Sequence, residues 1–195
     1  MTPLGVLVSG RGSNLDAIIR ACRRGDLPGE VISVASNKPG CAALEVARQA
    51  GVPAVRAFPL AEYGELAERD RGMAVWLQQA GVELVVTAGY DRVLDEAFVA
   101  AFEGRILNVH PSLLPAFKGT MRAIEEAFNA GVRETGVTVH LVEPHTVDGG
   151  RIIAQETVPV LAGDTLESVE ERIHSVEHRL LPQAIKQFIE TSLVR

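Results

Sequence analysis

The sequence predicts an α/β fold: a single domain with an open, mostly parallel twisted sheet, helices on both faces and a mixed edge. Short runs rich in β-branched residues alternate with helical patterns, which is typical of βαβ units around a parallel sheet. The last two strand-like runs follow one another without a helix between them. That end of the sheet is therefore expected to be antiparallel or mixed.

Six strands and six helices are expected along the chain. The strands are Leu4–Ser9, Val31–Ser36, Leu84–Ala88, Arg105–His110, Gly136–Val142 and Ile152–Val158. The helices are Asn14–Arg23, Ala42–Ala50, Leu60–Ala80, Asp95–Phe102, Lys118–Ala130 and Leu166–Ile189. In an open sheet of this kind ligands bind beyond the carboxyl ends of the strands, so a site is expected there.

The amino-terminal segment Met1–Ser9 is predicted to be a strand rather than a signal peptide, because it lacks a basic leading region and a small-residue cleavage site. No apolar run approaches the length of a membrane span. A composition of 47% hydrophobic and 23% charged residues is typical of globular proteins and excludes a disordered chain. We expect one domain over residues 1–195, which can bury roughly 70% of its unfolded surface.

The charge balance limits the kinds of partner that we expect, and the cysteine content indicates the cellular compartment. The chain has 19 basic and 25 acidic residues, a net charge of −6, and no run of like charges. This argues against a surface that binds nucleic acid. Cys22 and Cys41 have no metal-like spacing, and so few cysteines indicate a reducing, cytoplasmic location. We expect neither nucleic acid nor a membrane as a partner.

A glycine-rich turn, Gly10-Arg11-Gly12-Ser13-Asn14, opens the first helix. Glycines permit close backbone approach, and a helix N-terminus offers free N–H groups to a phosphate. A dinucleotide site is disfavoured because Leu15 stands where GxGxxG has its third glycine. Ser36-Asn37-Lys38 also offers no carboxylate to a ribose. A purely structural capping box, Ser13 with Asp16, is the alternative.

Asn108 and His110 end the fourth predicted strand. Residues two apart in a strand share a face, and Pro111 places the pair at the carboxyl end. An amide donor and an imidazole that converge on one point suit a developing oxyanion. A serine nucleophile is disfavoured, because GxSxG is absent and Ser112 lies in a proline-flanked turn. A structural pair satisfied by backbone groups is the alternative.

Asp148 lies between the last two predicted strands, directly before Gly149 and Gly150, a pattern typical of a turn. Thr138 and His140 alternate on the preceding strand. They either face the same cleft or belong to the core.

A third motif, His174-Ser175-Val176-Glu177-His178, matches the HxxEH pattern of zinc proteases on a predicted helix. The pattern is short, and Glu171, Arg172 and Arg179 around it favour a solvated helix face. We therefore expect no metal, and a zinc-dependent hydrolase is an alternative from another class of enzyme.

These segments together resemble the glycinamide ribonucleotide formyltransferases, folate-dependent enzymes of purine synthesis, over essentially the whole chain. The segments are Ser9–Leu15, Ala88-Gly89-Tyr90 with Arg92 and Leu94, Asn108–Pro115, Gly136–His140, Asp148-Gly149-Gly150 with Ile152–Gln155, and Val176–His178. The resemblance implies a Rossmann-like formyltransferase fold. It also implies transfer of a formyl group from 10-formyltetrahydrofolate to the amine of glycinamide ribonucleotide, without a metal, with a homodimer as the assembly to test.

The resemblance further implies roles for individual residues. Asn108, His110 and Asp148 would be catalytic: the first two donate to the oxyanion, and Asp148 favours the imidazolium. His110 or a water would carry the proton to the leaving folate nitrogen. The nucleotide's 5′-phosphate and ribose would be held by Gly12, Ser13, Asn14 and Glu177. The folate would be held by Asn108, Arg92, Val93, Leu94, Glu143, Pro144, His145, Thr146, Val147 and Asp148.

The sequence departs from the family at several positions near the folate. Asp91 replaces the usual methionine and Arg151 a common proline, and the segments Thr120–Arg122 and Glu143–Val147 are unusual. We expect these departures to affect folate affinity rather than reaction type. The family's arginine before the third long helix matches either Arg69 or Arg71. The resemblance also implies a cis Leu114-Pro115 bond.

Two related enzymes and a binding module share parts of this pattern. A formyltransferase acting on initiator methionyl-tRNA would carry a further carboxyl-terminal domain and a more basic surface. A deformylase would carry an additional amino-terminal domain. We expect neither, because the first strand begins at Leu4 and the chain ends at Arg195 with its net charge of −6. A non-catalytic module would bind the nucleotide without turnover.

Overall fold

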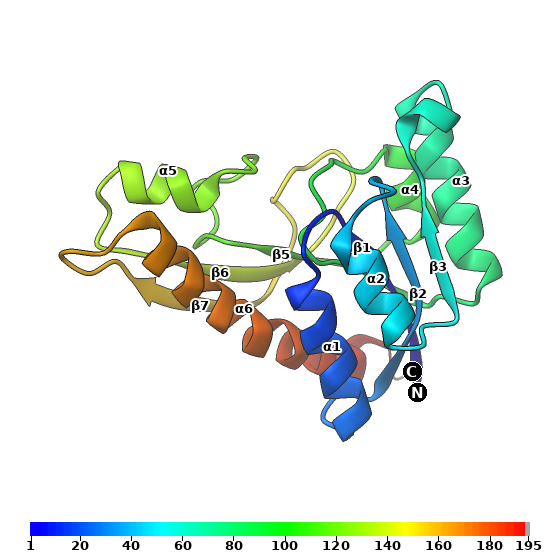
Figure 1. Ribbon diagram of the computed structural model, residues 1–195, viewed down its shortest axis with the longest axis horizontal. Helices are drawn as coiled ribbons and strands as arrows, with labels where there is room; N and C mark the ends of the chain where they lie inside the picture. The colour runs from blue at the N-terminus through cyan, green and yellow to red at the C-terminus, as the bar shows by residue number, and fades with distance from the viewer. Residues whose placement is uncertain (194–195) are drawn as a thin grey trace.

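Seven strands form the sheet, in the order β3-β2-β1-β4-β5-β6-β7 (Figure 1). The computed structural model describes residues 1–193, so the last two residues of the expected domain lie outside it. The strands are β1 (Thr2–Val8), β2 (Gly29–Ser36), β3 (Ala54–Ala57), β4 (Leu84–Thr87), β5 (Ile106–His110), β6 (Glu134–Leu141) and β7 (Ile152–Pro159). The α-helices are α1 (Ser13–Arg24), α2 (Ala42–Gln49), α3 (Leu66–Gln79), α4 (Glu96–Ala101), α5 (Ala123–Asn129) and α6 (Leu166–Phe188). A 3-10 turn, η1 (Leu60–Glu62), precedes α3, and a π-helical turn, η2 (Ile189–Leu193), follows α6.

The direction of the strands confirms the predicted mixed sheet. Strands β1 to β5 pair in parallel, whereas β6 runs antiparallel to β5, and β7 antiparallel to β6. The parallel strands are joined by helical crossovers, whereas β6 and β7 follow one another through a loop. The antiparallel pairing of β7 with β6 thus matches the missing helical pattern between these two strands, whereas the switch itself falls between β5 and β6, which are joined through α5.

Side-chain alternation along the strands separates two hydrophobic layers. Leu4 and Val6 of β1 pack in a layer that includes residues of α1, α2 and α6, whereas Leu7 packs in a layer that includes residues of α3 and α4. On β5, Leu107 belongs to the first layer and Ile106 to the second. Asn108 and His110 alternate with Leu107 and therefore face the same side of the sheet as Ile106. Helices cover both faces, as predicted.

Three elements differ from those expected. The edge strand β3 was not predicted, because it is only four residues long and largely half-buried, so it lacks a buried apolar run. The helix expected over residues 60–80 is interrupted at Gly64, whose φ of 77° is left-handed, and α3 begins only after Glu65. The helix expected over residues 118–130 begins only at Ala123, because Gly119 has a φ of 73°.

The chain turns sharply after β5. The bond between Leu114 and Pro115 is cis, as the resemblance implied. Phe117 has a φ of 53°, in the left-handed region. The segment after the strand thereby folds back over His110. Within residues 1–193, no helix has both the length and the apolar character needed to cross a membrane.

Candidate active site

A cavity of about 580 Å³ opens beyond the carboxyl ends of β1, β4 and β5. Its walls include every residue assigned to the site from sequence except Thr138. These are Gly12, Ser13, Asn14, Arg92, Val93, Leu94, Asn108, His110, His140, Glu143, Pro144, His145, Thr146, Val147, Asp148 and Glu177. A larger open hollow of about 1140 Å³ lies between α1, α2 and α6, but none of Asn108, His110 and Asp148 lines it.

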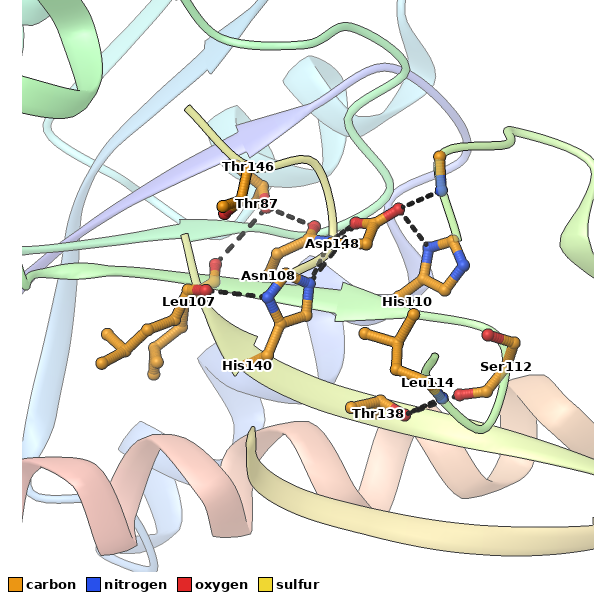
Figure 2. A network of polar contacts seen from close by, with 12 residues as sticks. Thr87, Leu107, Asn108, His110, Ser112, Leu114, Thr138, His140, Thr146 and Asp148 are labelled. Atoms are coloured by element: carbon orange, nitrogen blue, oxygen red, sulfur yellow. Dashed lines mark hydrogen bonds and ion pairs between the residues drawn. The ribbon is translucent and has the colours of Figure 1, made fainter. Parts of the chain in front are cut away.

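A row of three polar side chains crosses the sheet at the floor of the cavity (Figure 2). Thr87 of β4 is in register with Asn108 of β5, which is in register with His140 of β6. The Thr87 hydroxyl donates to Oδ1 of Asn108 at 2.5 Å, and Nδ2 of Asn108 lies 3.1 Å from Nε2 of His140. The Asn108 amide therefore presents its NH₂ group toward His140, and also toward Asp148, whose Oδ1 is 3.4 Å away.

His140 has one ring nitrogen in a fixed role. Its Nδ1 lies 2.8 Å from the carbonyl oxygen of Leu141, which can only accept, so Nδ1 carries a proton. In the neutral ring Nε2 then accepts from the Asn108 amide. In the protonated ring it donates instead to Oδ1 of Asp148, 3.4 Å away.

His110 is 95% buried and is held between two acceptors. Its Nε2 lies 2.9 Å from the carbonyl oxygen of Phe117, so this nitrogen carries a proton. Its Nδ1 lies 3.5 Å from Oδ2 of Asp148. Both ring nitrogens of His110 thus face acceptors, the Phe117 carbonyl on one side and the Asp148 carboxylate on the other.

Asp148 is held by a tight turn and remains ionised. Its φ is 49°, in the left-handed region that aspartate tolerates. A Cβ on Gly150 would lie 2.0 Å from the Leu141 carbonyl oxygen, so only glycine fits there. Burial alone would raise the pKa of Asp148. The His140 ring, the Gly119 amide and the charge on His110 outweigh burial, so the pKa lies below its usual range.

The glycine-rich turn presents the start of α1 to the cavity. Gly12 is the N-cap residue with a φ of 88°, and a Cβ there would lie 2.8 Å from Ala43. The structural capping box is not formed: no side chain caps the helix, and Asp16 pairs instead with Arg20 at 2.8 Å. The first N–H groups of α1 are thus left without a side-chain acceptor, as an anion site requires.

Glu177 of α6 is 4% exposed and forms the other wall of this part of the cavity. Its Oε2 accepts from Nδ2 of Asn14 at 3.1 Å and from Nδ1 of His174 at 2.9 Å. Oδ1 of Asn14 is buried and has no partner within the described chain. The hydrogen bond with Glu177 raises the pKa of His174. Nε2 of that ring lies 3.4 Å from the Arg11 guanidinium, which adds positive charge beside the turn.

The opposite mouth of the cavity is formed by two loops. Val93 is 56% exposed, and Leu94 packs half-buried on the layer that contains α3 and α4. Across from them, the segment Glu143–Asp148 is mostly exposed, and His145 lies 2.7 Å from Glu96 through Nδ1 and Oε1. These loops bring the apolar side chains of Val93, Leu94 and Val147 to the cavity, which suits a planar heterocycle.

Thr138 lies outside the cavity, contrary to one expectation. It is fully buried, and its hydroxyl donates to the Ser112 carbonyl at 2.6 Å while accepting from the Leu114 amide at 3.1 Å. It therefore holds the turn after β5 rather than a substrate. His140, the other residue of that pair, does face the site.

The HxxEH pattern brings His174 and Glu177 into contact but does not form a metal-binding group among the described residues. Glu177 points to Asn14, and the rings of His174 and His178 stack with their centroids 6.4 Å apart. Among residues 1–193 there is no group of three or more His, Cys, Asp or Glu side chains arranged to hold a metal ion. The pattern is explained by the Asn14–Glu177–His174 contacts.

Asp91, one of the departures near the folate, has defined partners. Asp91 pairs with Lys38 and accepts from Asn37 at 2.9 Å. Of the two candidate arginines, Arg69 is 2% exposed and donates to Asp70, whereas Arg71 is exposed.

Three groups in contact with Asn108, His110 or Asp148 were missed from sequence. They are the Thr87 hydroxyl, the Phe117 carbonyl and the Gly119 amide. Two are backbone groups that no residue type signals. Thr87 was detectable as a polar residue at the carboxyl end of a buried strand.

Comparison with known proteins shows the family to which the chain belongs. A family model described as formyl transferase matches residues 4–185. The phosphoribosylglycinamide formyltransferase of Haemophilus influenzae is 40% identical over 193 residues, covering 99% of this chain and 90% of that protein. The trifunctional purine biosynthetic protein adenosine-3 of Gallus gallus is 44% identical over 183 residues. The match covers 94% of this chain but spans only 18% of the chicken protein. The crystal structure of glycinamide ribonucleotide transformylase 1 from Symbiobacterium toebii superposes with a TM-score of 0.93 at 47% identity. That match covers 97% of this chain and 88% of the other.

Proposed function

Since the chain belongs to the formyl transferase family and catalyses formyl transfer to glycinamide ribonucleotide in purine biosynthesis, we propose that Asn108, His110 and Asp148 carry the reaction. The single observation that carries this proposal is their convergence in one cavity. An amide donor and an imidazole, each within 3.5 Å of the same partly buried carboxylate, lie at the carboxyl ends of the strands.

The reaction needs stabilisation of negative charge and one proton transfer. The primary amine of the nucleotide attacks the formyl carbon of 10-formyltetrahydrofolate, and the carbonyl oxygen becomes an oxyanion. The Asn108 NH₂ group and the His110 imidazolium are donors for that oxyanion. When the intermediate collapses, the bond to the folate nitrogen breaks. The proton that the attacking amine loses is carried to that nitrogen by His110 or a water. The products are N-formylglycinamide ribonucleotide and tetrahydrofolate.

Asp148 is the proposed charge partner of His110 while the oxyanion forms. Its own lowered pKa means that it stays ionised at neutral pH. An ionised carboxylate beside Nδ1 of His110 stabilises the positive charge on that ring. The carboxylate thus acts on the oxyanion through the imidazole.

The nucleotide fits the side of the cavity formed by α1 and α6. The uncapped N-terminus of α1, with Gly12, Ser13 and Asn14, suits the 5′-phosphate, and Arg11 and His174 add positive charge nearby. Glu177 accepts both of its hydrogen bonds through Oε2, which leaves Oε1 for a ribose hydroxyl. This arrangement orders phosphate, ribose and amine along a line that ends at Asn108.

The folate fits the opposite side. Arg92, Val93 and Leu94 form one wall for the pterin, and the residues Glu143, Pro144, His145, Thr146, Val147 and Asp148 form the other. Asn108 lies between the two sides and can contact either substrate. A formyl-folate donor follows from family membership, and we propose 10-formyltetrahydrofolate as that donor, with no metal taking part.

We also propose a cytoplasmic location, in keeping with a role in purine biosynthesis and with two free cysteines in the described chain. The homodimer stays a prediction, which sedimentation of the purified protein tests. No nucleic acid or membrane partner is proposed.

The proposed function is tested by incubating the protein with glycinamide ribonucleotide and 10-formyltetrahydrofolate. Mass spectrometry should detect the formylated nucleotide, and absorbance should report tetrahydrofolate at an equal rate. Asn108→Ala should lower kcat at least 100-fold, as removal of an oxyanion donor does. Asn129→Ala, an exposed asparagine at the end of α5, is the matched control and should leave turnover unchanged. Turnover that persists in Asn108→Ala would remove the amide from the mechanism.

A further inference from the structure

Thr87 contacts the proposed catalytic amide but has no assigned part in the reaction. It is 4% exposed, at the last position of β4, and its hydroxyl donates to Oδ1 of Asn108 at 2.5 Å. The only other acceptor within reach of that hydroxyl in the described chain is the Leu107 carbonyl, at the longer distance of 3.4 Å. We propose that Thr87 is a positioning residue, which fixes the direction of the Asn108 amide so that its NH₂ group faces the reacting carbonyl; this rests on the proposed function.

The two ends of a side-chain amide are nearly the same size, so packing alone does not decide its direction. Only the NH₂ end can donate to an oxyanion. A flipped amide would place Oδ1 where the negative charge develops and would repel it. The direction of the Asn108 amide therefore matters more for the transition state than for either substrate in its ground state.

The groups on the far side of Asn108 do not fix this direction in every protonation state. Nε2 of His140 accepts from the amide when the ring is neutral, but it competes as a donor when the ring is protonated. A protonated His140 would thus favour Oδ1 of a flipped amide. Asp148 favours the NH₂ end, but its Oδ1 is 3.4 Å from Nδ2, a weak contact.

Thr87 acts from the opposite side with a short hydrogen bond. Its backbone is fixed by parallel pairing with β5, in which it is the register partner of Asn108 itself. Threonine is also stiff about its first side-chain torsion, so the hydroxyl is preorganised. Loss of this donor would leave Oδ1 of Asn108 without its only side-chain partner in the described chain and allow both amide directions.

The test compares Thr87→Val with Thr87→Ser in the full-length protein, using glycinamide ribonucleotide and 10-formyltetrahydrofolate as substrates. Valine keeps the shape and removes the hydroxyl, and we expect kcat to fall roughly tenfold while both KM values change less than about twofold. Serine keeps the hydroxyl, and we expect it to retain most of the wild-type kcat. If the valine protein is not folded by circular dichroism, Thr87→Ala provides the same comparison.

Thr135 provides a matched control. It is a threonine of the same sheet, 2% exposed, whose hydroxyl has no partner within the described chain. Thr135→Val should leave kcat unchanged. The inference is overturned if Thr87→Val keeps the wild-type kcat, if serine and valine lose it equally, or if the loss appears only in KM. Absence of formyl transfer by the wild-type protein would instead refute the proposed function.

Discussion

Two histidine–carboxylate pairs line the same cavity but differ in almost every physical respect. His110 and Asp148 approach to 3.5 Å across a strand and a loop, whereas His174 and Glu177 approach to 2.9 Å one turn apart on α6. Asp148 is also contacted by His140, Asn108 and the Gly119 amide, whereas Glu177 accepts from His174 and Asn14.

The difference indicates how each pair is used. The short pair on α6 is a local i, i+3 contact that fixes Glu177 against the nucleotide turn. The longer pair joins groups from β5 and the loop after β6, and the histidine in it keeps a second nitrogen toward the loop at Phe117. The contacts thus place His110 in a network of several groups from different segments, and His174 in a local contact with the residue proposed to bind the ribose.

The largest expected effect comes from removing charge in the first pair. Asp148→Asn keeps the shape but removes the negative charge beside His110, so less of the imidazolium is present at neutral pH. We expect kcat to fall by roughly 100-fold, with smaller changes in both KM values. Steady-state kinetics measures the fall, and NMR of the His110 ring should show a smaller protonated fraction at pH 7.

The same substitution tests whether the two residues act together. His110→Ala should be at least as severe, and the double variant much less than multiplicative. If the protonated fraction of His110 were equal in the wild type and Asp148→Asn, the aspartate would be only a turn residue.

A change in the second pair, His174 and Glu177, should weaken nucleotide binding rather than lower kcat. Glu177→Gln keeps the shape but removes the charge that attracts His174 and weakens the acceptor for the ribose. We expect KM for the nucleotide to rise about tenfold, about 1.4 kcal/mol, with kcat and the folate KM nearly unchanged. A drop in kcat comparable to that of Asp148→Asn would show that the two pairs are not functionally distinct.

A smaller effect is expected in stability as a function of pH. The Glu177 hydrogen bond raises the pKa of His174 above the unfolded value, so this pair stabilises the fold below about pH 6.5. That stabilisation is lost as the pH rises through the folded pKa. His174→Gln should therefore lower the free energy of unfolding by roughly 0.5 kcal/mol at pH 5.5 and by less at pH 8, measured by denaturant unfolding.

His178→Gln is the matched control for this measurement. Burial lowers the pKa of His178, so its protonation costs stability at low pH, and its removal should give no loss at pH 5.5. If His174→Gln lowered the free energy of unfolding equally at both pH values, the charge pairing of His174 with Glu177 would not contribute to stability.

The smallest expected effect is that of a chelator. Turnover should survive prolonged treatment with EDTA, and metal analysis should find well under one zinc per chain. Activity that is lost with EDTA and restored by zinc would show that His174 and His178 are zinc ligands. The pairing of His174 with Glu177 would then not serve nucleotide binding alone.

Much of the fold was predictable from the sequence. The elements that were predicted wrongly have physical explanations. The antiparallel pairing of β6 with β7 was predictable from the missing helix between them, whereas the switch between β5 and β6, which α5 joins, was not. Strand β3 was not, because four half-buried residues carry too little hydrophobic pattern. The break before α3 depends on a single left-handed glycine, Gly64, within an otherwise helical pattern.

The site was predictable where residue types carry the chemistry. Asn108 and His110 share a strand face, and this alone placed them together. The approach of Asp148 needed the resemblance, because a turn aspartate before two glycines has no distinctive pattern. The Phe117 carbonyl beside His110 and the Gly119 amide beside Asp148 are backbone groups whose positions depend on how the segment after β5 folds.

The contacts of Asp91 have a consequence for how this protein can change. Asp91 after β4 binds Lys38 and Asn37 after β2, and its backbone N–H donates to Ser9 at the end of β1, whose hydroxyl donates in turn to Asn37. These hydrogen bonds outweigh burial and hold the pKa of Asp91 below its usual range. A chimera that exchanged only the loop after β4 with a methionine-bearing relative would leave Lys38 and Asn37 without their acceptor. Positions more than 50 residues apart would thus have to be exchanged together in such a chimera.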